Sequence, residues 1–328
     1  MATHQIIEAR DLFFRLRNKI RRLVLSKTTF NETQGKSDSQ VTFYEQQISR
    51  LLKSKKRLGN FRRKYDYREI LEHVIYSQGE SYLARIQENS PQNYVDLIKR
   101  NKENDLFGNP YKYQYSSVGR VSPTTLRYIA TAIDIFETIG INEDSVIAEI
   151  GVGYGGQAAI LERMYGIKNY SAFDLPSVIQ LSNVYLDIIN SKLKFIYTEP
   201  ITVKNNYWDL VISNYAFSEL HRDLQLSYIE SVIAKSKSGY MIMNSGRSNI
   251  TGRSEGKLTL DEMRKYIPNL QVKQAQAVLA MWQETAEAQK KELTELRNEI
   301  VSLRERIESL ENTIQQLEAE NATLKSQR

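Results

Sequence analysis

Three glycines and one aspartate are spaced as ligand-binding residues are in α/β proteins. Gly151, Gly153 and Gly155 follow an apolar segment, VIAEIG, and precede a predicted helix. Glycine suits a tight turn at this place because it leaves bare backbone for a ligand to pass over. Asp174 lies 21 residues after Gly153, at the end of the next predicted strand, where a carboxylate can accept hydrogen bonds from both hydroxyls of a ribose. The pattern predicts a site for a nucleoside-containing ligand.

Two cofactors contain such a nucleoside, NAD and S-adenosylmethionine, and the loop spacing separates them. A pyrophosphate site prefers G-x-G-x-x-G, whereas the set Gly151, Gly153 and Gly155 has the spacing G-x-G-x-G. Glu149 lies two residues before Gly151, and its carboxylate is compatible with the positive charge of a sulfonium. The spacing favours S-adenosylmethionine. NAD is the alternative, and a purely structural glycine turn is the third interpretation.

Strands alternate with helices from about residue 145 onward. The alternation predicts an α/β, Rossmann-like, doubly wound sheet of parallel strands. The strand candidates are VIAEIG, YSAFDL, LKFIYTE, YWDLVISNYA, YMIMNS and LQVKQ. AVLAMW (277–282) is interpreted as a strand pairing with LQVKQ, with the start of the next helix as the alternative.

The elements before the sheet are predicted to be helical. Residues 5–27 and most of 41–105 have helical patterns, and polar residues 31–40 form a loop between them. Residues 107–123 are rich in Gly, Pro, Asn and Tyr and are interpreted as a connector. Ser122 before Pro123 is a common N-cap and N1 pair, and predicts a helix to about Thr138.

Composition excludes several classes of site. The chain has no cysteine and three histidines, which rules out disulfides, thiolate metal sites, cysteine nucleophiles and a His-rich zinc site. We therefore expect no metal site. No apolar run approaches the roughly 18 residues of a membrane span, and no secretory signal is recognisable. These features predict a cytoplasmic protein.

The positive charge is concentrated at the start of the chain. Residues 1–64 hold 16 Lys/Arg against 5 Asp/Glu, whereas the whole chain has a net charge of +6. Such a segment favours phosphate, acidic lipid headgroups or nucleic acid as partners. A solvated helical face is an equally consistent interpretation.

The end of the chain has a heptad repeat over residues 284–328. Ile and Leu alternate at the a and d positions, with Asn321 as one polar a residue, and this pattern predicts a parallel coiled coil. The segment RIESLE resembles a trimer-forming pattern, so a homotrimer is favoured and a dimer is the alternative. Three regions are therefore predicted: 1–105 (basic, helical), 106–283 (sheet domain) and 284–328 (coiled coil).

Three segments resemble the class I S-adenosylmethionine-dependent methyltransferases: EIGVGYGGQ, FDLPSV and SNYAFSEL. GRVSPTTLRYIATAIDI (119–135) is similar, more narrowly, to the sugar O-methyltransferases of bacterial surface-polysaccharide loci. A methyltransferase domain followed by a coiled coil resembles the chain-terminating methyltransferases of O-antigen synthesis. The resemblance implies a glycan or lipid-linked polysaccharide as acceptor, at the inner face of the cell membrane, with the coil as oligomeriser and spacer.

Methyl transfer to a sugar hydroxyl needs positioning and a base that removes a proton. Glu219 and His221 are the candidate bases, and each is also explained as an ordinary residue at a helix start. Expected cofactor-binding residues are Glu149, Gly151, Gly153, Gly155, Asp174, Asn214 and Arg127. Expected acceptor-pocket residues are Tyr215, Phe217 and Arg120.

Three other functions are weighed against this one. They are an NAD-dependent dehydrogenase, a nucleic-acid or small-molecule methyltransferase recruited by the basic N-terminus, and an inactive scaffold whose coiled coil is the function. NPYKY (109–113) only faintly resembles an amino-methyltransferase motif and does not follow the fourth strand, so nucleic acid is not the expected partner.

Overall fold

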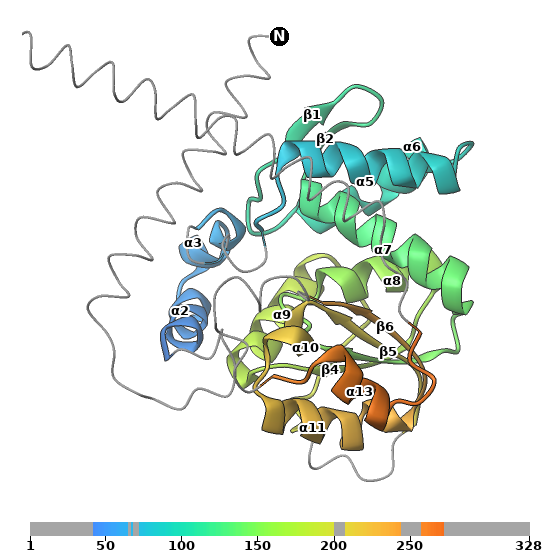
Figure 1. The fold of residues 1–328 in the computed structure, drawn as a ribbon. Coiled ribbons are helices and arrows are strands. Elements are labelled where there is room, and N and C mark those ends of the chain that lie inside the picture. The colour runs from blue at the N-terminus through green and yellow to red at the C-terminus, as the bar shows by residue number, and fades with distance from the viewer. Residues whose placement is uncertain (1–41, 65–66, 68–71, 200–206, 244–256, 272–328) are drawn as a thin grey trace, which may run out of the picture. The chain divides into compact units, whose positions relative to one another are not determined.

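The structure is a computed structural model, and it describes residues 42–64, 67, 72–199, 207–243 and 257–271 (Figure 1). The chain divides into two compact units, Met1–Leu270 and Gln271–Arg328, and every helix and strand below lies in the first. Four predicted elements lie outside the described residues: the helix 5–27, the loop 31–40, the strand AVLAMW and the coiled coil. The predicted strand LQVKQ also lies outside them from residue 272 onward.

Four parallel strands form the central sheet in the order β4-β3-β5-β6. The strands are β3 (Val146–Ile150), β4 (Asn169–Phe173), β5 (Trp208–Asn214) and β6 (Ser236–Ile242). The chain runs from β3 outward to β4 and then crosses back to β5 on the other side of β3. The predicted α/β class and parallel sheet are therefore confirmed for the described part of the chain.

Alternate side chains of the strands enter two separate cores, which is what a sheet covered on both faces requires. On β3, Ile147 packs into one core and Ala148 into the other. Helices α7 (Pro123–Ile139), α8 (Gly156–Tyr165) and α9 (Pro176–Ile188) contribute to the first core. The second core is covered by α11 (Arg222–Ser231) and α13 (Leu260–Tyr266), with the short helices α10 (Ala216–Glu219) and η4 (Ile233–Lys235) between strands (Figure 1).

Helix α7 begins and ends as its sequence predicts. The Ser122 hydroxyl accepts a hydrogen bond from the Thr125 amide, 3.1 Å away, and Pro123 occupies the first turn. The helix ends at Gly140, whose φ of 77° is the left-handed conformation that glycine adopts most readily.

A helical layer precedes the sheet, in agreement with the prediction for residues 41–105. Its elements are α2 (Thr42–Leu52), α3 (Lys55–Leu58), η1 (Phe61–Arg63), α5 (Tyr76–Asn89), α6 (Tyr94–Asn101) and η2 (Lys102–Asp105). Helix α5 packs against α7, and α2 packs against α9. None of the helices in the described part of the chain is long and apolar enough to cross a membrane.

Two local predictions are wrong. LKFIYTE (193–199) forms no strand. At Phe195 the backbone bonds to a side chain and not to a neighbouring strand: Asn183 Nδ2 donates to the Phe195 carbonyl and Asn183 Oδ1 accepts from the Phe195 amide, both at 2.8 Å. The predicted connector contains a small antiparallel hairpin, β1 (Tyr113–Tyr115) with β2 (Gly119–Val121).

Candidate functional site

The candidate site lies where the carboxyl ends of β3 and β5 meet. After β3 the chain turns to α8 on one face of the sheet, and after β5 it turns to α10 and α11 on the other. Ligands of open α/β sheets bind in the crevice that such a divergence opens. Ser213 holds the two strand ends together: its hydroxyl donates to the Ile150 carbonyl, and its oxygen accepts from the Phe217 amide, both at 3.0 Å.

The glycine loop has the backbone that its sequence predicts. Gly151, Gly153 and Gly155 have φ values of 82°, 57° and 86°, all in the region that favours glycine. At Gly151 a side chain would also meet the turn after β5, since a Cβ there would lie 2.1 Å from the Ala216 Cβ. The loop after β3 and the turn after β5 are therefore in direct contact at this point, and a side chain at position 151 would push them apart.

Asp174 follows β4 and holds the loop in place. One carboxylate oxygen accepts from the Gly153 amide at 3.0 Å, and the other accepts from the Leu175 amide at 2.8 Å. Burial raises the pKa of Asp174 to about 6, although the two backbone amides lower it. The half-buried carboxylate keeps further lone pairs, which suits it to receive hydroxyl donors.

Glu149 on β3 is a buried acid beside the loop. Burial raises the pKa of Glu149 to about 8, and the nearby charge of Asp174 also raises it. The Tyr170 hydroxyl donates a hydrogen bond to this carboxyl at 2.7 Å, and that bond lowers the pKa. Near neutral pH this carboxyl is largely protonated, and a cation brought close to it would favour its ionised form.

Arg127 on α7 is a buried cation without a carboxylate partner among the described residues. The residue is 6% exposed, and its guanidinium lies 5.1 Å from the centre of the Tyr128 ring. Burial disfavours its charged form, but the facing phenol groups of Tyr128, Tyr82 and Tyr215 outweigh that effect and raise the pKa. A buried guanidinium in this setting can bind an anionic group of a ligand.

Asn214, the last residue of β5, has an unsatisfied side chain. Both polar atoms of its amide are buried, and neither has a hydrogen-bond partner among the residues that the structure describes. Leaving such groups unpaired costs about 1–3 kcal/mol each, so a ligand is the natural source of partners. Tyr215 follows with a φ of 71°, a strained value for a residue other than glycine.

The remaining predicted residues differ in how close they lie to the crevice. Phe217 is buried in the same core as Ile150, while Glu219 is half-buried on α10. His221 is exposed at the start of α11. Arg120 is exposed on β2, in the small hairpin outside the central sheet.

One residue at the site, Tyr44 of α2, had no signal in the sequence. Burial raises its pKa well above the ordinary range, and the charges of Asp174 and Glu219 raise it further. Its sequence neighbours show a helical pattern only. The position of Tyr44 at the site depends on the packing of α2 against α9, and a sequence pattern within α2 cannot predict that packing.

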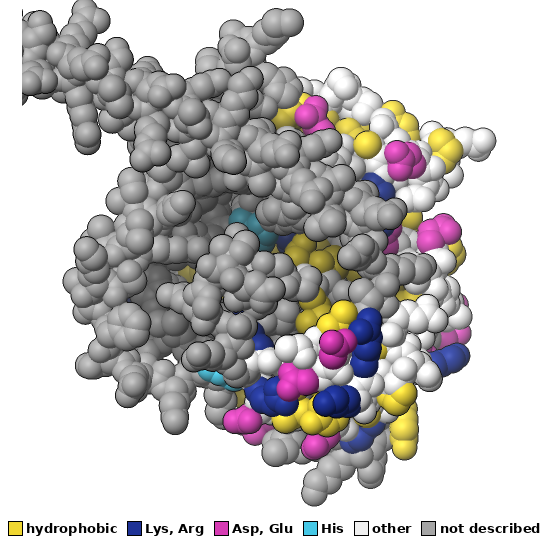
Figure 2. Space-filling model, viewed as in Figure 1, with side chains coloured by type: hydrophobic (Ala, Val, Ile, Leu, Met, Phe, Trp, Pro, Cys, Tyr) yellow, Lys and Arg dark blue, Asp and Glu magenta, His cyan; other side chains and the backbone are white. Residues whose placement is uncertain are grey.

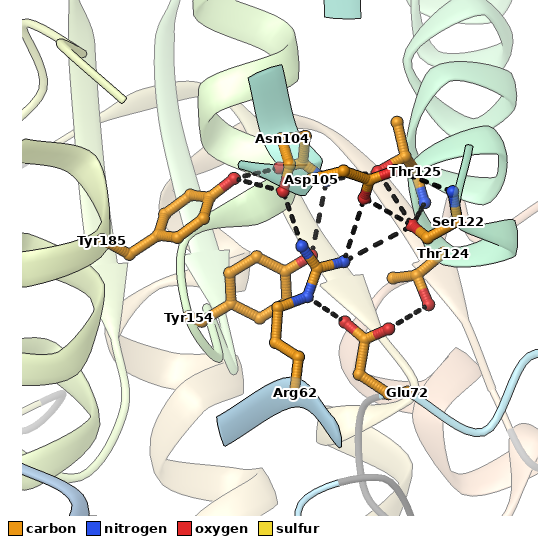
Figure 3. A network of polar contacts seen from close by, with 9 residues as sticks. All are labelled: Arg62, Glu72, Asn104, Asp105, Ser122, Thr124, Thr125, Tyr154 and Tyr185. Carbon is orange, nitrogen blue, oxygen red and sulfur yellow. Dashed lines mark hydrogen bonds and ion pairs between the residues drawn. The ribbon is translucent and has the colours of Figure 1, made fainter. Parts of the chain in front are cut away.

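A second unforeseen feature is a buried polar network behind the glycine loop (Figure 3). The Arg62 guanidinium donates to Glu72 and to the Asn104 carbonyl, both at 2.5 Å, and lies 3.5 Å from an Asp105 oxygen. It also lies 4.6 Å from the centre of the Tyr154 ring. Since Tyr154 belongs to the loop sequence GVGYGG, the network connects the N-terminal helices to the loop.

Comparisons with known proteins find similarity in structure alone. No protein-family model matches the chain, and no curated protein sequence matches it. Among solved structures, the protein in complex with a Haloferax volcanii methyltransferase activator is 19% identical, with a TM-score of 0.34, over 44% of this chain and 68% of that one. An S-adenosylmethionine-dependent methyltransferase from Clostridium acetobutylicum is 14% identical, with a TM-score of 0.33, over 38% and 53%. Because the identities are this low, the assignment below is argued from the residues of the site.

Proposed function

We propose that the chain is an S-adenosylmethionine-dependent methyltransferase. The observation that carries the proposal is the set of unsatisfied or charged groups around the glycine loop. Asp174 suits ribose hydroxyls, Glu149 suits a positive charge, and Arg127 suits a carboxylate. The two ends of the buried Asn214 amide offer a donor and an acceptor. A ligand with a ribose, a sulfonium and an amino-acid end satisfies every member of this set.

The glycine loop alone does not exclude the dehydrogenase alternative, because Gly151, Gly153 and Gly156 also fit the G-x-G-x-x-G spacing of a pyrophosphate site. The proposal rests on the residues around the loop. S-adenosylmethionine carries a sulfonium and an amino-acid carboxylate, for which Glu149 and Arg127 are the matching groups.

When bound, S-adenosylmethionine supplies a methyl group activated for displacement. The chain's residues orient the acceptor and take up its proton. Glu219 is the better base of the two candidates, because it is half-buried and shares the neighbourhood of Tyr44 with Asp174. His221 is exposed to solvent, where an imidazole is poorly placed to receive a proton inside a closed site.

For the acceptor we propose a sugar hydroxyl of a surface polysaccharide, with capping of O-antigen chains as the specific role. The support is the sequence similarity of GRVSPTTLRYIATAIDI and the heptads of residues 284–328. In this proposal the coiled coil joins catalytic domains into a homo-oligomer and sets their height above the growing glycan. Tyr215 lines the acceptor side of the crevice.

The test is incubation of the full chain with labelled S-adenosylmethionine and lipid-linked glycans, followed by mass spectrometry to locate the methyl group. Glu219→Gln should lower the turnover rate about 10²–10⁴-fold without changing cofactor affinity. His221→Gln is the matched control and should keep at least half of the rate. Equal rates for wild type and Glu219→Gln would remove Glu219 from the mechanism, and methylation of nucleic acid in place of glycan would overturn the acceptor class.

A further inference from the structure

The surface of α2, α3 and η1 has an unusual charge pattern. Residues 46–64 contain eight cations and no carboxylate. One cation, Arg62, is buried and is neutralised by Glu72 and Asp105. The other seven are exposed, and we call them the basic surface: Arg50, Lys53, Lys55, Lys56, Arg57, Arg63 and Lys64.

The seven cations have no carboxylate partner among the described residues. No salt bridge joins any of them to another residue in the part of the chain that the structure describes. Two other cations at the surface do have such partners: the half-buried Arg222 pairs with Glu262 at 2.8 Å, and the exposed Arg264 pairs with Asp261 at 2.7 Å. Figure 2 shows both signs of charge interspersed over α11 and α13. The positive electrostatic potential over the basic surface is therefore stronger than the potential over this mixed surface.

The basic surface is also rigidly attached to the candidate site. Phe61, Arg62 and Arg63 are consecutive residues of η1, yet they face opposite ways. Phe61 and Arg62 point inward, and their side chains contact the ring of Tyr154 in the glycine loop. Arg63 points outward, with its guanidinium 4.5 Å from the centre of the Tyr111 ring. The η1 part of the basic surface is thus packed directly against the glycine loop.

We infer that the basic surface docks the protein on an anionic lipid membrane. The cations lie on the outer sides of two short helices and a turn, which suits a broad layer of headgroups. Nucleic-acid surfaces that bind single strands add exposed aromatic rings on which bases stack. Among the described residues beside these cations, Phe61 is fully buried and Tyr111 is half-buried beneath Arg63, so neither ring is open for a base to stack on. This inference is independent of the proposed reaction.

The test is co-sedimentation of the full chain with phosphatidylcholine vesicles that contain or lack phosphatidylglycerol. Binding should require the anionic lipid and should fall steeply with added salt. Each cation near such a surface contributes about a fivefold factor, so the variant Lys53→Gln, Lys55→Gln, Lys56→Gln, Arg57→Gln should bind several hundred-fold more weakly. The matched control, Lys99→Gln, Arg100→Gln, Arg264→Gln, Lys265→Gln, removes four exposed cations elsewhere and should bind within a few-fold of wild type.

Calorimetry with S-adenosylmethionine and thermal unfolding of both variants show whether they remain folded. Equal binding by the two variants would overturn the inference, and so would salt-independent binding or no binding to anionic vesicles. A DNA duplex added as competitor decides between anionic partners. The competition compares the phosphate concentration of duplex DNA with that of free anionic lipid. If wild-type protein leaves the vesicles at a lower concentration of DNA phosphate than of lipid phosphate, the basic surface binds nucleic acid and the inference is wrong.

Discussion

The Glu149 carboxyl is buried and lies beside the proposed site of the cationic ligand. Binding of that ligand is therefore coupled to the protonation state of this carboxyl. Its pKa in the free protein is about 8, raised by burial. A bound cation favours the ionised form and lowers that pKa, so below pH 8 binding must release a proton. We expect affinity for S-adenosylmethionine to rise between pH 7 and pH 8 and then level off.

Calorimetry in buffers of different ionisation enthalpy measures the released proton directly. Glu149→Gln cannot ionise, so proton release at pH 7 should fall close to zero and the pH dependence should flatten. The neighbouring acid Asp174 has a pKa of about 6 and is mostly ionised across this range, so its contribution is small. An unchanged proton count in Glu149→Gln would assign the coupling to another group.

At the scale of elements, the contact between the glycine loop and the turn after β5 is tested by Gly151→Ala. The substitution combines an unfavourable φ of 82° with a Cβ 2.1 Å from that of Ala216. We expect a loss of about 2–4 kcal/mol in stability, together with loss of cofactor binding. The measurement is urea unfolding followed by calorimetry.

Two controls separate the backbone effect from the steric one. Gly140→Ala has a similar φ of 77° but no atom within 4 Å of the added Cβ, so it should cost only about 1–2 kcal/mol. In the double variant Gly151→Ala, Ala216→Gly the steric part should be recovered. If Gly151→Ala and Gly140→Ala are equally destabilising, the two loops are not in contact as described.

The buried network around Arg62 gives a second prediction for elements. Arg62→Met leaves Glu72 and Asp105 buried without their cation, which typically costs about 3–5 kcal/mol. The adjacent Arg63 is exposed, so Arg63→Met should change stability by no more than about 0.5 kcal/mol. Urea unfolding of both variants is the measurement, and equal effects would show that the network does not stabilise the fold.

Elements with strong local signals could be predicted from the sequence, whereas long-range contacts could not. The start of α7 follows from Ser122 and Pro123, and β3 with its glycine loop follows from apolar residues before Gly151. LKFIYTE has the composition of a strand, but bonds from Asn183 hold its backbone instead. At the site, Asn214 and Asp174 are identified by their places at strand ends. The tyrosines around Arg127 come from distant parts of the chain, so no local pattern predicts its environment.

At the scale of the whole molecule, the heptads of residues 284–328 predict the assembly state. Ile and Leu at the a and d positions bury a continuous apolar seam when parallel strands associate. Sedimentation equilibrium should give a homotrimer for the full chain, with a dimer as the alternative, and a monomer for residues 1–283. The same mass per particle for both lengths would place the association in another part of the protein.

The most direct test of the proposed function is calorimetric titration of the full chain with S-adenosylmethionine and, separately, with NAD. We predict saturable binding of S-adenosylmethionine and none of NAD. Asp174→Ala should weaken that binding by about 1–3 kcal/mol, because it removes both the acceptor for ribose and the anchor of the Gly153 amide. The exposed Asp261→Ala is the control and should bind as wild type does. Folded protein that gives no heat with S-adenosylmethionine, or that binds NAD more tightly, would contradict the proposed function.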